Sequence, residues 1–198
     1  PDQMRHLADD IDTSTVDTLV DTVASRFDQA HRLYKLKAKV LGVAKLKYHE
    51  RQAPVGKITG KYSYEKSCQL VSSTFNQLDP EFVKIFQMFV RDRQIDVFPS
   101  VGKKGGAFCA VERPTTPTYI LLNHTDKLQD VLTLAHEVGH GINNELMRRQ
   151  KYAVNFGSPL STAEVASTFM EDFVLDKLAE KCTPRERFVL IMQKLDDD

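Results

Sequence analysis

The sequence predicts a mainly helical protein with one small antiparallel β-sheet, and three observations lead to this fold class. Apolar residues recur at spacings of three and four along much of the chain, which is typical of amphipathic helices. Two of these patterns begin with a capping residue that is followed by proline. Between residues 95 and 123, short β-rich runs are separated by glycine and proline, as in strands that are joined by turns.

One long amphipathic helix is expected over residues 14–41. Its apolar residues, from Val16 to Tyr34, follow the helical spacing, and Ser14 with Asp17 has the pattern of a capping box. We therefore expect a single helix of about 42 Å, at about 1.5 Å per residue.

The regions on either side of this helix lack helical periodicity. Residues 1–12 are polar, and residues 52–61 carry one proline and two glycines, which are typical of a loop or linker. We therefore expect an N-terminal helical segment over residues 1–51 and a second part over residues 52–198.

Residues 62–92 are expected to form two helices. The first covers residues 63–77, and the second begins with Asp79 as N-cap, Pro80 at the first helical position and an acidic Glu81. Three strands are expected to follow as the small sheet of residues 95–123, over residues 95–98, 107–111 and 118–122.

The remainder of the chain is again helical in pattern. Helices are expected over residues 126–150 and 162–181, separated by a loop that contains glycine and proline. A last helix is expected to begin at Thr183, where Glu186 completes a capping box and a proline takes the first helical position.

Composition restricts the classes of partner. The chain has 27 basic and 27 acidic residues, so it creates no global field that would attract nucleic acid or an anionic membrane. Cys68, Cys109 and Cys182 are widely spaced and odd in number, which favours reduced thiols over a disulfide framework. Because there is no apolar run of about 18 residues and no signal-peptide pattern, we expect a cytoplasmic protein.

The sequence His136-Glu137-Val138-Gly139-His140 predicts a metal site. On a helix, two histidines four residues apart lie on one face, where two neutral imidazoles can share one metal ion. The glutamate that follows the first histidine can reach a metal-bound water as general base. The motif therefore points to a zinc peptidase with one Zn²⁺ per chain, against the alternative of a structural helix with an accidental match.

A catalytic zinc site needs a third protein ligand. A metzincin is excluded, because that class requires glycine and histidine where this chain has Asn143 and Leu146. Spacing alone leaves five candidates, which are His124, Glu145, Glu164, Glu171 and Asp172.

Glu164 and Glu171 lie two helical turns apart and therefore share one face of the expected helix. Each has a plainer interpretation. Glu164 stands three residues after Ser161 and could complete a capping box, and Glu171 could be an exposed acidic residue. If Glu164 is the ligand, Glu171 could instead accept the free ring N–H of a ligand histidine.

These residues belong to a wider pattern, because the stretch from about residue 95 to residue 178 resembles the oligoendopeptidase F group of zinc peptidases, relatives of thimet oligopeptidase. The helices between residues 16 and 42 also look like those of that family. The segments that carry the resemblance are residues 95–97, 102–109, 130–140 and 160–171.

The resemblance implies a zincin-like catalytic core in which a second helix supplies the third ligand. It implies His136, His140 and Glu164 as zinc ligands, Glu137 as the base and Glu171 as the carboxylate that orients a ligand histidine. It also implies that a strand edge pairs with the backbone of a short peptide substrate, as in β-augmentation. The residues implied for that edge are Gly105, Gly106, Ala107 and Phe108.

The expected function is therefore zinc-dependent hydrolysis of peptide bonds in short oligopeptides. Members of the family are longer at both ends, and their C-terminal part contributes a segment with tyrosine and histidine that helps to bind the oxyanion. We therefore expect the 198-residue chain to be the catalytic-core portion of a longer protein, which holds the metal but hydrolyses peptides weakly or not at all by itself. The alternative is a non-catalytic, zinc-containing peptide-binding or scaffold fragment.

Overall fold

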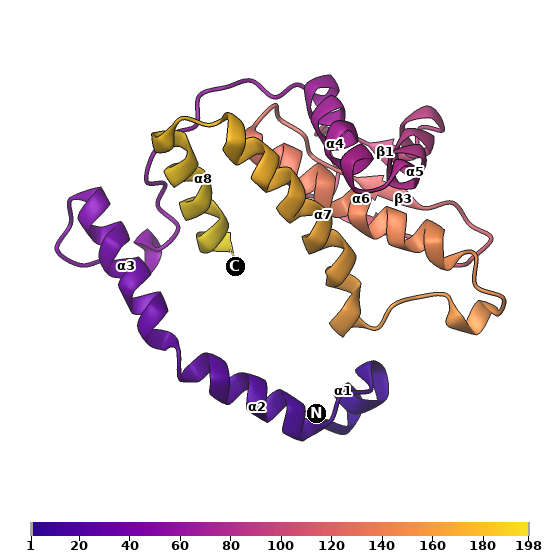
Figure 1. Ribbon diagram of the computed structural model, residues 1–198, viewed down its shortest axis with the longest axis horizontal. Coiled ribbons are helices and arrows are strands. Elements are labelled where there is room, and N and C mark those ends of the chain that lie inside the picture. Colours follow the sequence, from indigo (N-terminus) through magenta and orange to yellow (C-terminus); the bar gives the residue numbers. More distant parts are fainter. Residues whose placement is uncertain (1, 198) are drawn as a thin grey trace. The chain divides into compact units, whose positions relative to one another are not determined.

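A computed structural model describes residues 2–197, which are mainly helical with one small sheet (Figure 1). The chain divides into two compact units, of which one covers Thr59–Lys181 and the other combines the residues up to Ile58 with those from Cys182 onward. This division differs from the expected split after residue 51, because the last helix is grouped with the N-terminal helices. None of the described helices combines the length and the apolarity that crossing a bilayer requires.

In the unit that combines the residues up to Ile58 with those from Cys182 onward, all regular structure of the described residues is helical. In this unit the predicted capping box of the last helix is confirmed, because Thr183 N donates to Glu186 Oε2 (3.1 Å) and Glu186 N donates to Thr183 Oγ1 (3.3 Å). Its helices are α1 (Asp2–Asp9), α2 (Thr13–Ala24), α3 (Phe27–Leu41), the 3-10 helix η1 (Tyr48–Glu50) and α8 (Pro184–Asp197).

The single helix that was expected over residues 14–41 is wrong, because α2 ends before α3 begins. Near the break, Thr22 Oγ1 and Ser25 Oγ donate to backbone carbonyls of the preceding turn, each at 2.7 Å. Such bonds compete with the helical ladder. The Ser14 capping pair is also wrong, since Asp12 is the N-cap and no side chain caps α2.

The unit Thr59–Lys181 contains the remaining helices. The N-cap of the second helix is as predicted, because Asp79 Oδ1 accepts from Glu81 N (2.7 Å). Ser63 was expected as the first residue of the first helix but is its N-cap, and its Oγ accepts from Lys66 N (3.3 Å). The helices of this unit are α4 (Tyr64–Leu78), α5 (Pro80–Arg91), α6 (Leu128–Met147), the 3-10 helix η2 (Ala153–Asn155) and α7 (Leu160–Lys181).

The same unit holds a three-stranded sheet, formed by β1 (Ile95–Asp96), β2 (Phe108–Ala110) and β3 (Tyr119–Leu121). The strand order is β1-β3-β2, with β3 parallel to β1 and antiparallel to β2. The sheet is therefore mixed rather than antiparallel as expected. The reason is that β3 inserts between β1 and β2, and it runs in the same direction as β1 and in the opposite direction to β2. This topology leaves β2 at an edge.

Helix α6 lies at the centre of this unit and is the element around which the others pack. Its apolar side chains Val131, Leu134 and Val138 are fully buried. Two glycines allow close approaches: a Cβ on Gly139 would lie 2.8 Å from the carbonyl oxygen of Ala166 on α7, and a Cβ on Gly141 would meet an aromatic ring of α5 at 2.7 Å. Both distances are far inside van der Waals contact, so only glycine fits.

Candidate metal centre

The two motif histidines lie on one face of α6, and a glutamate of α7 faces them. The rings of His136 and His140 have centroids 5.0 Å apart. Glu164 Oε2 lies 3.2 Å from His136 Nε2 and 3.4 Å from His140 Nε2. The three potential ligand atoms lie within 4.8 Å of one another, and within the described residues they form a group that could hold a metal ion.

The convergence of these residues depends on the close contact between α6 and α7. Gly139, within the motif, touches the backbone of α7 at Ala166 and Ser167. The fully buried Ser167 also donates its hydroxyl to Glu164 Oε2 at 2.8 Å, which orients the carboxylate. Because Ser161 lies inside α7 rather than before it, the capping-box interpretation of Glu164 does not hold.

Sequence reasoning assigned no role to Gly139 or Ser167. For Gly139 a signal was present, since glycine is unfavourable inside a helix and therefore indicates a close approach by another element. Ser167 gave no comparable signal, because a serine on a helix is unremarkable until the neighbouring carboxylate is placed.

Glu171 lies beside the first histidine. Its Oε2 is 2.9 Å from His136 Nδ1, and the residue is 9% exposed, so the interpretation as an exposed acid is wrong. This hydrogen bond is the main cause that raises the pKa of His136. A carboxylate beside Nδ1 favours the tautomer with the proton on that nitrogen, which leaves Nε2 available to a metal ion.

Glu137 is 7% exposed and lies between α6 and β2. The backbone N–H of Cys109 donates to its carboxylate, but burial has the larger effect and raises the pKa of Glu137. Burial also lowers the pKa of His140, which favours the neutral imidazole that a metal ion requires. The site therefore combines potential metal ligands with a carboxylate, that of Glu137, whose raised pKa makes it a better proton acceptor.

These groups line an open cleft of about 540 Å³ between α6, β2 and the start of α7. Of the predicted substrate-binding residues, Ala107 and Phe108 line this cleft. Gly106 lines a neighbouring cavity together with Ala107, and Gly105 lines neither. Asn144, which sequence reasoning did not single out, also lines the cleft.

The other candidate ligands have different environments. His124 bonds through Nε2 to Ser67 Oγ at 3.1 Å. Glu145 accepts from Thr118 Oγ1 at 2.7 Å and from Arg148 Nε at 2.9 Å. Asp172 is exposed and takes part in no group of potential metal ligands among the described residues.

The loop that leads into β2 is braced by two side chains. Asn123 Nδ2 donates to the carbonyl oxygens of Lys104 (2.9 Å) and Gly106 (2.8 Å). Lys103 Nζ donates to the carbonyl oxygen of Phe98 at 2.8 Å and lies 2.9 Å from Asp96 Oδ1. These bonds fix the entry to the strand that borders the cleft.

Comparisons with known proteins identify a family and related sequences that match almost the whole of this chain. The sequence model of peptidase family M3 matches residues 3–197. An oligoendopeptidase F homolog of Lactococcus lactis subsp. lactis (strain IL1403) is 29% identical over 181 residues, which are 91% of this chain and 30% of the relative. A homolog of the same name from Borreliella burgdorferi is 28% identical over 98% of this chain and 33% of the relative.

A similar fold is found among solved structures. The crystal structure of a candidate peptidase from Chlamydophila abortus matches with a TM-score of 0.80 and 23% identity, and the match covers 94% of this chain and 31% of that one. At this identity the likeness concerns the fold. The chain thus spans about a third of the length of the proteins that it matches.

Proposed function

The chain belongs to peptidase family M3, and on this premise we propose that it is the zinc-binding catalytic core of an oligopeptidase that hydrolyses short peptides. The observation that carries the proposal is the convergence of His136, His140 and Glu164 beside the buried Glu137 in one open cleft. In this proposal the first three residues hold the metal and Glu137 is the general base.

The residues present fit a zinc ion. Two imidazole nitrogens and one carboxylate oxygen are a donor set of catalytic zinc sites, in which a fourth position stays open. The hydrogen bond from His136 Nδ1 to Glu171 supports this assignment, because ligand histidines commonly donate their second ring N–H to a carboxylate. Zinc bound by these residues would supply Lewis-acid activation of a water molecule and of the peptide carbonyl.

Glu137 is the proposed proton carrier. Burial raises its pKa, which makes the carboxylate a stronger base than an exposed glutamate. In the proposed reaction Glu137 accepts a proton from the attacking water and passes it to the amine that leaves.

A peptide substrate would be held by the free edge of β2, and the pairing of β3 supports this. In β3, Ile120 N donates to Gln94 O (2.9 Å), and just beyond it Leu122 N donates to Asp96 O (2.8 Å). These amides therefore point toward β1. Because alternate residues of a strand direct their backbone groups to opposite sides, the other residues of β3 face β2.

The register then determines which backbone groups of β2 face outward. Phe108 and Ala110 lie opposite the residues of β3 that face β2, so their amides are used inside the sheet. Ala107 and Cys109 alternate with them and face the free edge, in agreement with the bond from Cys109 N–H to Glu137. Ala107 is therefore the residue proposed to pair with the backbone of a peptide that lies across the cleft.

The test compares the zinc-loaded chain with its Glu137→Gln variant, using a quenched fluorescent peptide and metal analysis. We expect about one zinc per chain in both proteins. We expect weak turnover by the unsubstituted chain and turnover at least about a hundredfold lower in the variant, since general-base catalysis contributes about 10²- to 10⁴-fold.

Equal turnover by the two proteins would show that Glu137 is not the base. Equal turnover at background level together with full zinc content would favour a peptide-binding fragment instead. Zinc content far below one equivalent would remove the metal site itself.

A further inference from the structure

A second cavity adjoins the metal cleft. It has a volume of about 240 Å³ and is called the side cavity below. Ala107 lines both spaces, so the edge of the sheet leads from one to the other. The residues that line the side cavity are Gly106, Ala107, Leu122, Asn123, His124, Asp130 and Thr133.

The position of the side cavity relative to the proposed base follows from helix geometry. Thr133 lies four residues before Glu137 on α6, which is about 6 Å along the helix axis and on the same face. An extended peptide advances about 3.3 Å per residue. A peptide paired with Ala107 would therefore present to the side cavity the residue about two positions from the bond at Glu137.

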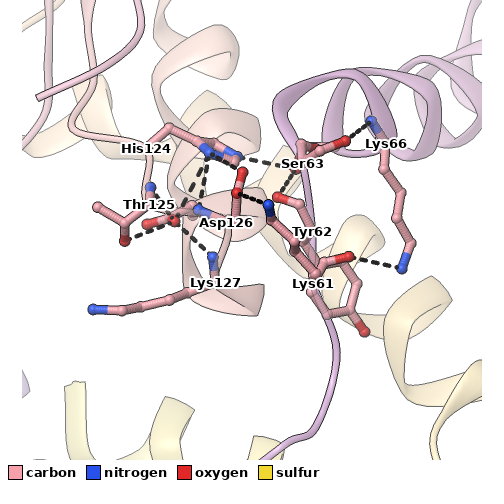
Figure 2. Close-up of polar contacts among 10 residues, drawn as sticks. Lys61, Tyr62, Ser63, Lys66, His124, Thr125, Asp126 and Lys127 are labelled. Carbon is pink, nitrogen blue, oxygen red and sulfur yellow. Dashed lines mark hydrogen bonds and ion pairs between the residues drawn. The ribbon is translucent and has the colours of Figure 1, made fainter.

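The wall of the side cavity is held in place by the segment before α4 (Figure 2). Tyr62 N donates to the carbonyl oxygen of Asp126 at 2.9 Å, and Lys61 Nζ forms an ion pair with Asp126 Oδ2 at 3.1 Å. His124 bonds to Ser67 at 3.1 Å. Because these bonds tie the turn before α6 to a second element, the cavity is formed before any ligand enters.

The imidazole in this wall, that of His124, has a hydrogen-bond partner at each ring nitrogen. The backbone N–H of Asp126 donates to His124 Nδ1 at 3.3 Å, so Nδ1 carries a lone pair and the ring proton lies on Nε2. Nε2 then donates to Ser67 Oγ, whose own hydroxyl can donate to the carbonyl oxygen of Ser63 at 3.0 Å. His124 Nδ1 also lies 3.7 Å from Asp126 Oδ1 and 3.9 Å from Asp130 Oδ2, and both distances exceed that of a hydrogen bond.

Asp130 is the residue that gives the side cavity its charge. Its Oδ2 accepts from the backbone N–H groups of Thr125 (2.7 Å) and Lys127 (2.9 Å) and from the Thr125 hydroxyl (3.2 Å). All these bonds end on one oxygen, and the side chain is 17% exposed. No lysine or arginine lines the cavity, and Figure 2 shows that the Lys127 side chain extends away from His124.

We propose that the side cavity is a subsite that binds a cationic group of the peptide, with Asp130 as its counter-ion. The group is an ammonium, which a lysine side chain or a free peptide N-terminus can supply. A charge-assisted hydrogen bond to a partly buried carboxylate favours such a group over a neutral one. This inference rests on the proposed function, because it requires a peptide in the cleft.

The test measures binding rather than turnover, by calorimetry on the zinc-loaded chain in which Glu137→Gln prevents cleavage. The probes are an acetylated and amidated hexapeptide of alanine and leucine, its six single-lysine versions, the matching glutamate versions and the parent with a free N-terminus. We expect one lysine position to bind about tenfold more tightly than the parent, and glutamate at that position to bind more weakly. The free N-terminus tests the second source of the ammonium.

Two further substitutions, each made in the Glu137→Gln chain, test whether Asp130 causes the gain in affinity. Asp130→Asn keeps an oxygen that accepts the bonds of the turn but removes the charge, so it should abolish the tenfold gain and preserve binding of the parent peptide. Glu65→Gln is the control, because it removes an equal charge from an exposed residue of the same unit that neither lines the cavity nor takes part in the bonds that hold its wall. It should leave the gain intact.

The possible results separate the two proposals. If the parent peptide binds but no cationic position gains affinity, the subsite is refuted and the proposed function stands. Equal effects of the two substitutions would also refute the subsite, because they would indicate a long-range field. If no peptide binds to the zinc-loaded chain, both proposals fail. The comparison of lysine with glutamate peptides remains decisive if Asp130→Asn reduces folding.

Discussion

Glu171 contacts His136, one of the residues of the candidate metal site. Its carboxylate lies 2.9 Å from His136 Nδ1, on the side of the ring away from the nitrogen that faces Glu164. The hydrogen bond restricts rotation of the imidazole and selects its tautomer. Glu171 is therefore expected to influence metal affinity without touching the metal.

Replacement of Glu171 by glutamine should weaken zinc binding about 10- to 100-fold, which is the usual effect of losing a partner of a ligand histidine. The affinity can be measured by competition with a chromogenic chelator. Asp172→Asn is the control, because it removes the charge of the adjacent, exposed residue. Equal affinities of the two variants would contradict the orienting role.

At the scale of single residues, spacing predicts a pair of ligands better than a triad. His136 and His140 could be paired from the sequence because the geometry of one helix fixes their separation. Spacing alone left five candidates for the third ligand, and the family resemblance singled out Glu164. The choice depends on packing between helices, and no periodicity in the sequence reports such packing.

At the scale of elements, the contact between α6 and α7 determines the geometry of the site. The backbones approach so closely at Gly139 that a methyl group there would lie 2.8 Å from both Ala166 O and Ser167 Cα. Ser167 is also the residue that donates to Glu164. A displacement of α7 at this point would therefore move the proposed third ligand.

Gly139→Ala should lower both stability and zinc affinity. Overpacking of a close contact costs about 1–3 kcal/mol, which exceeds the gain in helix propensity of about 1 kcal/mol at most. Urea unfolding of the zinc-free chain measures the first effect and chelator competition the second. Gly105→Ala is the control, since a Cβ there meets no atom within 4 Å and should leave both unchanged. An unaltered zinc affinity in Gly139→Ala would show that the position of α7, and of Glu164 on it, does not depend on this contact.

Helices and caps were predicted more successfully than the sheet. Asp79 and Thr183 cap their helices as expected because a cap is a local hydrogen bond between near neighbours in sequence. The order of the strands is not local, since β3 inserts between β1 and a β2 that follows β1 in the chain. The break after α2 was missed because apolar periodicity continues through it.

At the scale of the whole molecule, the three cysteines lie in different parts of the chain and report on the burial of each. All are free thiols, as expected, and they lie on α4, on β2 and after α7. Burial is the main cause that raises the pKa of each, to about 11 for Cys68 and about 12 for Cys109. The thiolate, which is the reactive form, is therefore scarce in the folded chain near neutral pH.

Alkylation by iodoacetamide at about pH 8 should be at least about a hundredfold slower at Cys68 and Cys109 in the folded chain than in concentrated urea. Because the pKa values are raised, the rate in the folded chain should increase about tenfold for each unit of pH below the pKa. Mass spectrometry of the three peptides measures the rates. Similar rates at all three thiols in the folded and unfolded chain would contradict the prediction.

The extent of the units was the least predictable property. Residues 52–58 were expected to begin the second part, yet Gly56 packs against Val189 of α8 at a distance that admits no Cβ. This contact joins residues more than a hundred positions apart. Composition and local pattern carry no information about such a pairing.

The free edge of β2 has a further consequence, which concerns self-association. An unpaired strand can recruit the same strand of a second molecule as readily as it recruits a peptide. In this chain the edge strand has three residues, Lys104 lies just before it, and Pro114 follows four residues after it. Short length, a lysine and a proline all limit growth of a continuous sheet. The chain can therefore offer its backbone to a short peptide and still resist aggregation through the same edge.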